Sequence, residues 1–154
     1  MKQLLALLTT IFVASCSTPK DSLQVQQYHL RESMFQENND PMVRGEVQRR
    51  LHGAITLAER REKIGQYYTV SYCRSREESQ ANAAPVKIIF EYQQAVTASA
   101  IKRMEKSVSC TDEQEVEFAV VGEDYAKNGR VLTWRVRVME GEQVLAEKRS
   151  YLWR

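Results

Sequence analysis

Glycine is scarce in this sequence, with only six residues in a chain of 154. Glycine-rich loops are needed where a backbone closely approaches a phosphate, as in nucleotide-binding folds. The sequence contains no such loop, and it lacks the G-x-S-x-G and H-E-x-x-H patterns of serine hydrolases and zinc proteases. We therefore identify no catalytic residue and no cofactor site, and we expect a protein that is not an enzyme.

The sequence also lacks a large excess of basic over acidic residues, or of acidic over basic ones. The chain has 22 basic and 20 acidic residues, whereas nucleic-acid binding requires a strongly positive surface. Basic residues gather between positions 44 and 63, but glutamates are interleaved with them. We interpret this segment as a solvated helix face whose charges pair with one another. Nucleic acid is therefore excluded as the main partner.

The apolar run of the chain is short and lies at its beginning, over residues 4–14. A membrane-spanning helix needs about 20 apolar residues, so this run is too short to serve as one. Lys2 precedes the run, and small residues follow it. A basic start, an apolar middle and small residues before a cut are the three parts of a secretory signal peptide.

The residues at the predicted cut, Val13-Ala14-Ser15-Cys16, resemble the lipobox of bacterial lipoproteins. The resemblance implies that residues 1–15 are removed and that Cys16 becomes the first mature residue, with lipid on its sulfur. Two or more acyl chains anchor a protein firmly to a membrane. Ser17 resembles the outer-membrane sorting class of this family. In a bacterium with two membranes, it implies an outer-membrane lipoprotein that faces the periplasm.

Two cysteines, Cys73 and Cys110, remain if Cys16 carries lipid. An even number in an oxidising compartment favours a disulfide, which would close a loop of about 37 residues and stabilise the fold by about 3–4 kcal/mol. The alternative is two reduced thiols, one on each side of a sheet. The two cysteines form no recognised metal-ligand spacing with His29 and His52, so we predict no metal site.

A helical pattern follows Asp40-Pro41, a capping side chain before the residue that suits the first turn. Gly53 interrupts the pattern, because glycine inside a helix costs up to about 1 kcal/mol relative to alanine. Thr56 and Glu59 have the spacing of a capping box at the start of a second helix. We expect helices over residues 41–51 and 57–64.

From residue 66 onward, apolar and polar residues alternate as they do in half-buried strands. The alternating segments are residues 66–73, 86–92, 115–120, 132–138 and 144–153, and we interpret the ambiguous segment 101–108 as a further strand. Asn128-Gly129 predicts a two-residue hairpin turn, and Gly141 predicts the next turn. We therefore expect the last three strands to form an antiparallel meander.

Strands of this length and spacing predict a mainly β fold, an antiparallel β-sandwich preceded by a short helical segment. An immunoglobulin-like arrangement is one candidate, although Trp134 follows both cysteines instead of lying between them. The other candidate is an α+β fold whose helices cover one face of a single sheet. The predicted parts are a signal peptide (1–15), a lipidated cysteine with a polar tether (16–40), a helical segment (41–65) and the β domain (66–154).

The anchor and the missing catalytic pattern favour a structural or protein-interaction module that binds another envelope protein. Exposed edge strands of a sandwich are natural surfaces for such a partner. The alternative is a lipoprotein that binds a small ligand or glycan in an aromatic groove lined by Tyr72, Tyr92 and Trp134. Their positions in alternating segments also suit the core.

Lipidation at Cys16 is tested by growing cells with labelled palmitate and separating their membranes. The chain should take up label and sediment with the membranes, and the Cys16→Ala variant should do neither. Label that persists in Cys16→Ala would show that the acyl chain is attached elsewhere.

Overall fold

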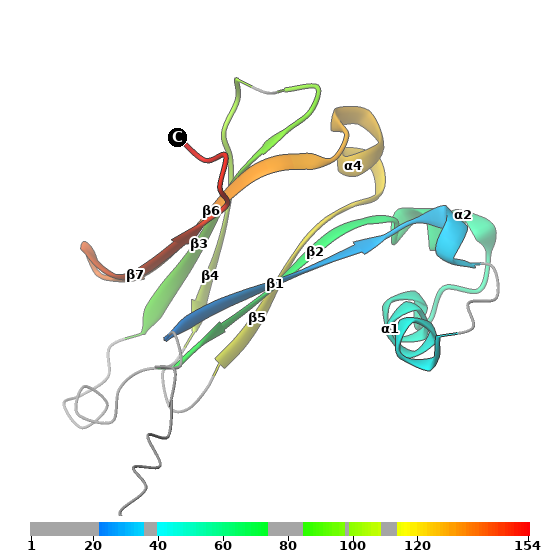
Figure 1. Ribbon diagram of the computed structural model, residues 1–154, viewed down its shortest axis with the longest axis horizontal. Coiled ribbons are helices and arrows are strands. Elements are labelled where there is room, and N and C mark those ends of the chain that lie inside the picture. Colours follow the sequence, from blue (N-terminus) through cyan, green and yellow to red (C-terminus); the bar gives the residue numbers. More distant parts are fainter. Residues whose placement is uncertain (1–21, 36–39, 74–84, 98, 109–113) are drawn as a thin grey trace, which may run out of the picture.

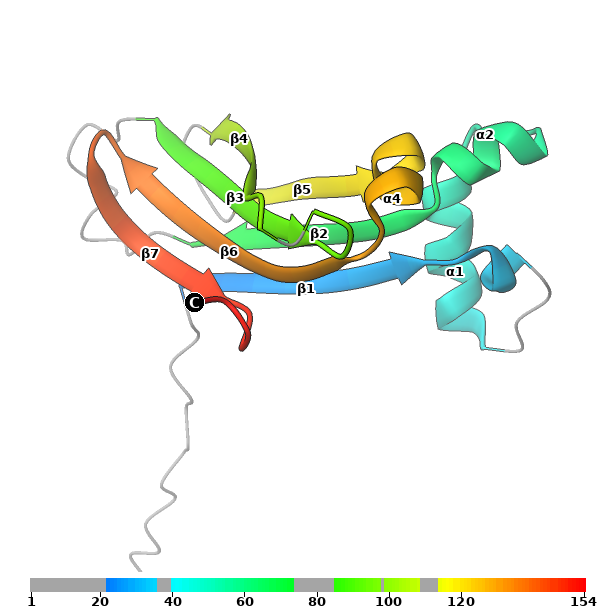
Figure 2. The same ribbon diagram turned by 90° about the horizontal axis from the view of Figure 1, so that it is seen from above.

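The computed structural model describes residues 22–35, 40–73, 85–97, 99–108 and 114–154. Over these residues the chain folds into two antiparallel sheets packed face to face (Figures 1 and 2), which confirms the predicted β-sandwich. The strands are β1 (Leu23–Leu30), β2 (Gly65–Tyr72), β3 (Val86–Gln94), β4 (Lys102–Val108), β5 (Gln114–Val121), β6 (Val131–Glu140) and β7 (Gln143–Arg149). The predicted strand over residues 101–108 is therefore confirmed as β4.

One sheet has the strand order β1-β2-β5, and the other has the order β4-β3-β6-β7. Immunoglobulin constant-type domains place their first, second, fifth and fourth strands in one sheet and the remaining three in the other. The described strands follow this order, except that β4 pairs with β3 and not with β5. The strand order is thus immunoglobulin-like with the fourth strand moved to the opposite sheet.

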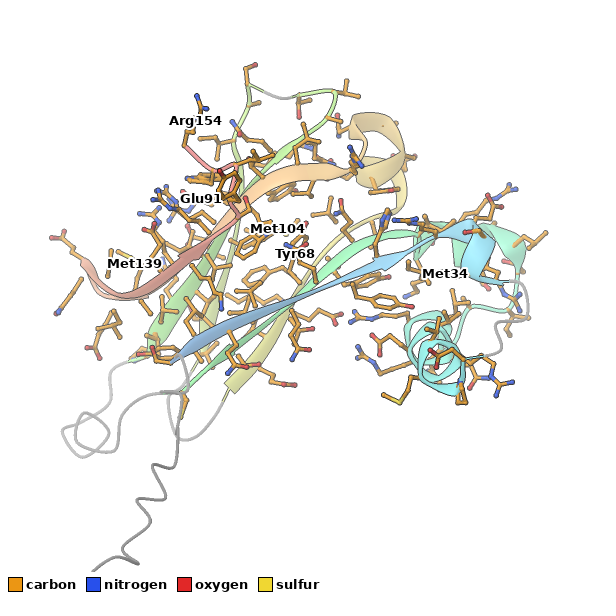
Figure 3. The ribbon with its side chains drawn as sticks, in the orientation of Figure 1. Met34, Tyr68, Glu91, Met104, Met139 and Arg154 are labelled. Carbon is orange, nitrogen blue, oxygen red and sulfur yellow. The ribbon has the colours of Figure 1, made fainter. Side chains whose placement is uncertain are left out.

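The core lies between the sheets and is centred on stacked aromatic rings. The ring of Phe90, on β3, lies 4.6 Å from that of Tyr68 and 5.3 Å from that of Phe118, which both belong to the three-stranded sheet. Figure 3 shows Tyr68 in the space between the two sheets. All three side chains are at most 1% exposed. Burial of such rings stabilises the fold by area and by their offset contacts.

β1 shortens the predicted tether, because Leu23–Leu30 pairs with β2 along its whole length. Its apolar residues change face midway. Leu23 and Val25 pack against the core between the sheets, whereas Tyr28 and Leu30 pack on the outer face under a helix. Simple alternation therefore fails across this strand, which explains why the sequence pattern indicated a polar tether here.

The two predicted helices are present as α1 (Pro41–Leu51) and α2 (Leu57–Glu62). The side chain of Asp40 accepts a hydrogen bond from the Met42 N–H, and Thr56 and Glu59 form the predicted capping box. Figure 1 shows α1 on the outer face of the three-stranded sheet, away from the four-stranded sheet. Figure 2 shows that α1 runs across the strands, at the end of the sandwich where β1 finishes.

The predicted meander is wrong in its first turn. β5 pairs with β2 in one sheet, β6 pairs with β3 in the other, and a short helix, α4 (Gly122–Asn128), joins them. Asn128 caps this helix by donating to the Asp124 carbonyl, and Gly129 ends it with a φ of 76°. Asn-Gly suits a helix end as well as a hairpin, because both need positive φ. The β6–β7 hairpin at Gly141 forms as predicted, but β7 ends at Arg149, before residue 153.

Gly65 begins β2 where no side chain fits. Its φ is 149°, and an added Cβ would lie 2.1 Å from the carbonyl oxygen of Val120 on β5. Because both strands are held in register over their full length, neither backbone can move away without breaking ladder hydrogen bonds. A glycine at this position therefore allows the backbones of β2 and β5 to approach closely.

The two alanine variants Gly65→Ala and Gly45→Ala should therefore change stability in opposite directions. Gly65→Ala should lower the free energy of unfolding by about 1–3 kcal/mol, the usual cost of overpacking, or prevent folding. Gly45 lies inside α1 with no atom within 4 Å of an added Cβ, so Gly45→Ala should raise it by about 0.5–1 kcal/mol. Urea unfolding measures both, and a neutral Gly65→Ala would contradict this packing.

Candidate functional site

The three aromatic residues considered for a ligand groove are core residues. Tyr72, Tyr92 and Trp134 are 5%, 3% and 8% exposed, and all three belong to the hydrophobic cluster between the sheets. The Tyr92 hydroxyl also donates to the carboxylate of Asp124 on α4, at 3.4 Å. This is the packing expected of core side chains, and the rings offer little surface to a ligand.

Of the two cysteines predicted to form a disulfide, the structure describes Cys73. Cys73 directly follows β2 and is exposed, whereas Cys110 and the lipidation residue Cys16 lie outside the described residues. The neighbouring Tyr72 pairs with Gln114, four positions after Cys110. The disulfide therefore stays a prediction.

The histidines are placed separately. His29, on β1, lies 2.7 Å from the hydroxyl of Tyr125 through Nε2, and its Nδ1 accepts a hydrogen bond from Arg31. Burial, followed by the charges of Arg31 and Arg130, lowers the pKa of His29, so its ring is neutral at pH 7. His52 lies in the turn after α1.

A groove on the outer face of the three-stranded sheet is the strongest candidate for a binding site. α1 forms its wall and the strands form its floor, and it has a volume of about 410 Å³. Its lining residues are mostly polar: Gln26, Gln27, Tyr28, Glu46, Arg49, Arg50, Thr69, Glu115 and Glu117. Because three consecutive residues of β1 line it, the groove extends to the edge of the sheet.

Arg50 fixes the wall of the groove to its floor. Its side chain is only 4% exposed and lies 4.0 Å above the ring of Tyr67 on β2. The guanidinium pairs with Glu46 of α1 at 2.8 Å and with Glu117 of β5. A buried cation needs such partners to offset its loss of hydration. Arg50 belongs to the segment predicted as a solvated helix face, and its burial corrects that prediction for this residue.

One row of side chains across the three strands, with Glu115 from the next row, forms the floor. Gln26, Thr69 and Glu117 lie opposite one another on β1, β2 and β5. The next row is Gln24, Ser71 and Glu115. The groove lining contains three carboxylates, at positions 46, 115 and 117, and two guanidinium groups, at positions 49 and 50. Two positive and three negative charges leave the groove with a net charge of −1.

Among the described strands, β1 pairs with β2 alone, so its other edge is open to pairing. The N–H of Cys73 donates to the carbonyl of Ser22, so even-numbered residues of β1 exchange hydrogen bonds with β2. The backbone groups of Leu23, Val25, Gln27 and His29 therefore point away from β2. The Leu23 carbonyl accepts from Lys148 of β7 at 3.4 Å. This leaves the stretch from Val25 to His29 as the outward edge.

Charge distinguishes β1 from the other edge strands of the described sheets. Its sequence, LQVQQYHL, holds no residue charged at pH 7, no proline and no register shift. The other edges carry charged side chains: Lys102, Arg103, Glu105 and Lys106 on β4, Glu115 and Glu117 on β5, and Glu147, Lys148 and Arg149 on β7. Charges and bulges are the usual protection of sheet edges against pairing with other chains.

Arginines also gather on the outer face of the four-stranded sheet. Arg135 and Arg137 of β6 both pair with Glu91 of β3, at 2.6 and 2.9 Å, and Arg135 lies over the ring of Trp153. Figure 3 shows Glu91 on the side of this sheet that faces away from the core. One carboxylate is therefore shared by two guanidinium groups, which leaves these three residues with a net charge of +1.

No family model matches the chain, and no curated protein or solved structure matches it either. None of the helices in the described segments is long and apolar enough to cross a membrane. Those segments also contain no group of three or more His, Cys, Asp or Glu side chains placed to hold a metal ion.

Glu46 gives a pH test of the contact between α1 and the sheet. Hydrogen bonds from Arg49, followed by those from Arg50, lower the pKa of Glu46 from 4.5 to about 2. Its contribution to stability is therefore complete above about pH 4.5 and is lost as the pH falls towards 2. The free energy of unfolding should fall from pH 7 to pH 3 in both proteins. The fall should be smaller in Glu46→Gln than in the unchanged protein, by at most about 2 kcal/mol.

Urea unfolding at the two pH values measures this difference. The control is Glu123→Gln on α4, a residue whose side chain is 87% exposed and pairs with Lys127. It should respond to acid as the unchanged protein does. Equal acid sensitivity of Glu46→Gln and the unchanged protein would contradict the inferred ion-pair network.

Proposed function

We propose that the protein is an envelope lipoprotein, anchored by lipid on Cys16, that acts without catalysis by binding another envelope protein. The observation that carries the proposal is the open edge of β1. Val25, Gln27 and His29 present outward backbone groups along a strand with no charged residue at pH 7. An extended segment of a partner can add to such an edge by main-chain hydrogen bonds.

The position of β1 in the chain supports this proposal. Leu23 begins β1 seven residues after Cys16. A link of seven residues spans at most about 25 Å, so a lipid on Cys16 would hold the start of β1 close to the bilayer. α1, α2 and α4 lie at the other end of the sandwich (Figures 1 and 2). The anchor would therefore leave the helical end and the groove facing away from the membrane.

In a bacterium with two membranes, the proposal places the protein on the outer membrane, facing the periplasm. Ser17 after the lipidated cysteine supports that location, as the lipoprotein resemblance implies. A protein held close to the bilayer by its lipid meets partners that are themselves fixed in the envelope. Local confinement raises the effective concentration of such partners, so a single added strand can suffice for binding.

Proline substitution on β1 tests the proposal. The Gln27 N–H points outward, so Gln27→Pro removes a donor from the edge without removing a β1–β2 hydrogen bond. The matched control is Glu147→Pro, because the hydrogen bond between the Ser150 N–H and the Trp134 carbonyl places Glu147 at an outward position of β7. The tagged full-length protein should recover a stoichiometric partner from solubilised envelopes.

The control Glu147→Pro should recover the same partner, and Gln27→Pro should recover at least about tenfold less. Urea unfolding of all three proteins shows whether each variant is folded. Retention of the partner by folded Gln27→Pro would contradict strand addition on β1. Recovery of the free monomer alone by the unchanged protein would contradict the proposed function as a whole.

A further inference from the structure

The groove and the open edge of β1 form one continuous surface. Gln26, Gln27 and Tyr28 line the groove, and the outward backbone groups of Gln27 and His29 belong to the same stretch of strand. A strand added to β1 would therefore lie along the mouth of the groove. The inference below rests on the proposed function and concerns the chemistry of the segment that adds.

We propose that the added segment carries a lysine or arginine whose side chain enters the groove between α1 and the three-stranded sheet. Residues directly opposite one another in a sheet project to the same face. The partner residue opposite Gln26 therefore projects onto the outer face, in line with the row Gln26–Thr69–Glu117. Strands lie about 4.8 Å apart, so the side chain needs the length of lysine or arginine to pass over β1.

The charge of the groove selects a cation. Its three carboxylates exceed its two guanidinium groups by one. Both guanidinium groups already pair with Glu46 and Glu117. Glu115 is exposed and has a 3.4 Å contact with the hydroxyl of Ser71. An acidic group entering the groove would face this excess of carboxylates, whereas an ammonium or guanidinium group would balance it.

Two further features of the groove favour the binding of a cation. Arg49 is 58% exposed, and an exposed ion pair contributes little stability, so it can be rearranged at small cost. Tyr28 lines the groove, and its phenol oxygen is buried without a hydrogen-bond partner among the described residues. A donor from the partner that reaches this oxygen would satisfy a group whose burial otherwise costs about 1–3 kcal/mol.

Three fluorescent peptides test the inference. Each has eight residues of alternating threonine and valine with blocked ends, and the fourth residue is lysine, glutamine or glutamate. Fluorescence anisotropy measures their binding to the full-length protein in detergent. The lysine peptide should bind about two- to fivefold more tightly than the glutamine peptide, and the glutamate peptide should bind most weakly.

Glu115 lies on β5, about 14 Å from a strand added to β1, so its charge acts on the lysine through space. Glu115→Gln should therefore reduce the preference for lysine, because it removes the surplus carboxylate. Glu142→Gln, in the exposed turn between β6 and β7, should leave the preference unchanged. Gln27→Pro should weaken the binding of all three peptides. Raising the salt concentration should reduce the difference between the peptides, since exposed charges are screened.

The outcomes separate this inference from the proposed function. If all three peptides bind equally well and Gln27→Pro abolishes their binding, the proposed preference for a basic side chain is wrong, whereas strand addition on β1 is still supported. If Gln27→Pro alters neither the binding of the peptides nor the preference for lysine, the claim that the groove and the edge of β1 bind one segment together is wrong. Binding of soluble murein fragments, with no binding of any peptide, would assign the groove to a glycan and overturn the inference, while the envelope pull-down would still decide the proposed function.

Discussion

One buried cation determines the shape of the proposed binding surface. Arg50 projects from α1 onto the ring of Tyr67 and pairs with Glu46 on its own helix and Glu117 on β5. Val47, Val43 and Leu51 of α1 pack on an apolar cluster of the sheet, and the ion pairs of Arg50 fix the helix over that cluster in one position. Because α1 covers only one end of the outer face, its side forms the wall of a groove and the uncovered strands form the floor.

The strand that borders this groove has to serve two surfaces. The first half of β1 packs its apolar residues into the core, and the second half packs them beneath α1. The exposed positions of β1, Gln26 and Gln27, carry neutral amide groups in place of charges. Its edge therefore lacks the charges that protect the other edge strands of the described sheets, and we infer that the same property suits it for pairing with another chain.

Most of the architecture could be predicted from the sequence. Asp40-Pro41, the capping box at Thr56 and Glu59, and the alternation in β2, β3 and β6 depend on neighbours in the chain, so local patterns identify them. β1 lies within the predicted tether. Its first half packs into the core and its second half packs beneath α1, so its apolar residues do not alternate regularly. The pairing of β5 with β2 was mispredicted for a different reason, because Asn128-Gly129 fits both a hairpin and a helix end. The groove depends on Arg50 meeting Glu117, 67 positions away in the chain, and an arginine among interleaved glutamates gave no signal of burial.

The claim that β1 is the pairing edge is tested most directly by amide hydrogen exchange, followed by NMR in the free protein and in its complex with the lysine peptide. In the free protein the amides of Gln24, Gln26 and Tyr28, which bond to β2, should exchange slowly, and those of Val25 and Gln27 should exchange fast. The complex should slow the exchange of Val25 and Gln27 at least about tenfold and leave the edge strand β4 unchanged. Slow exchange of Val25 and Gln27 before any peptide is added, or no protection in a saturated complex, would contradict the account.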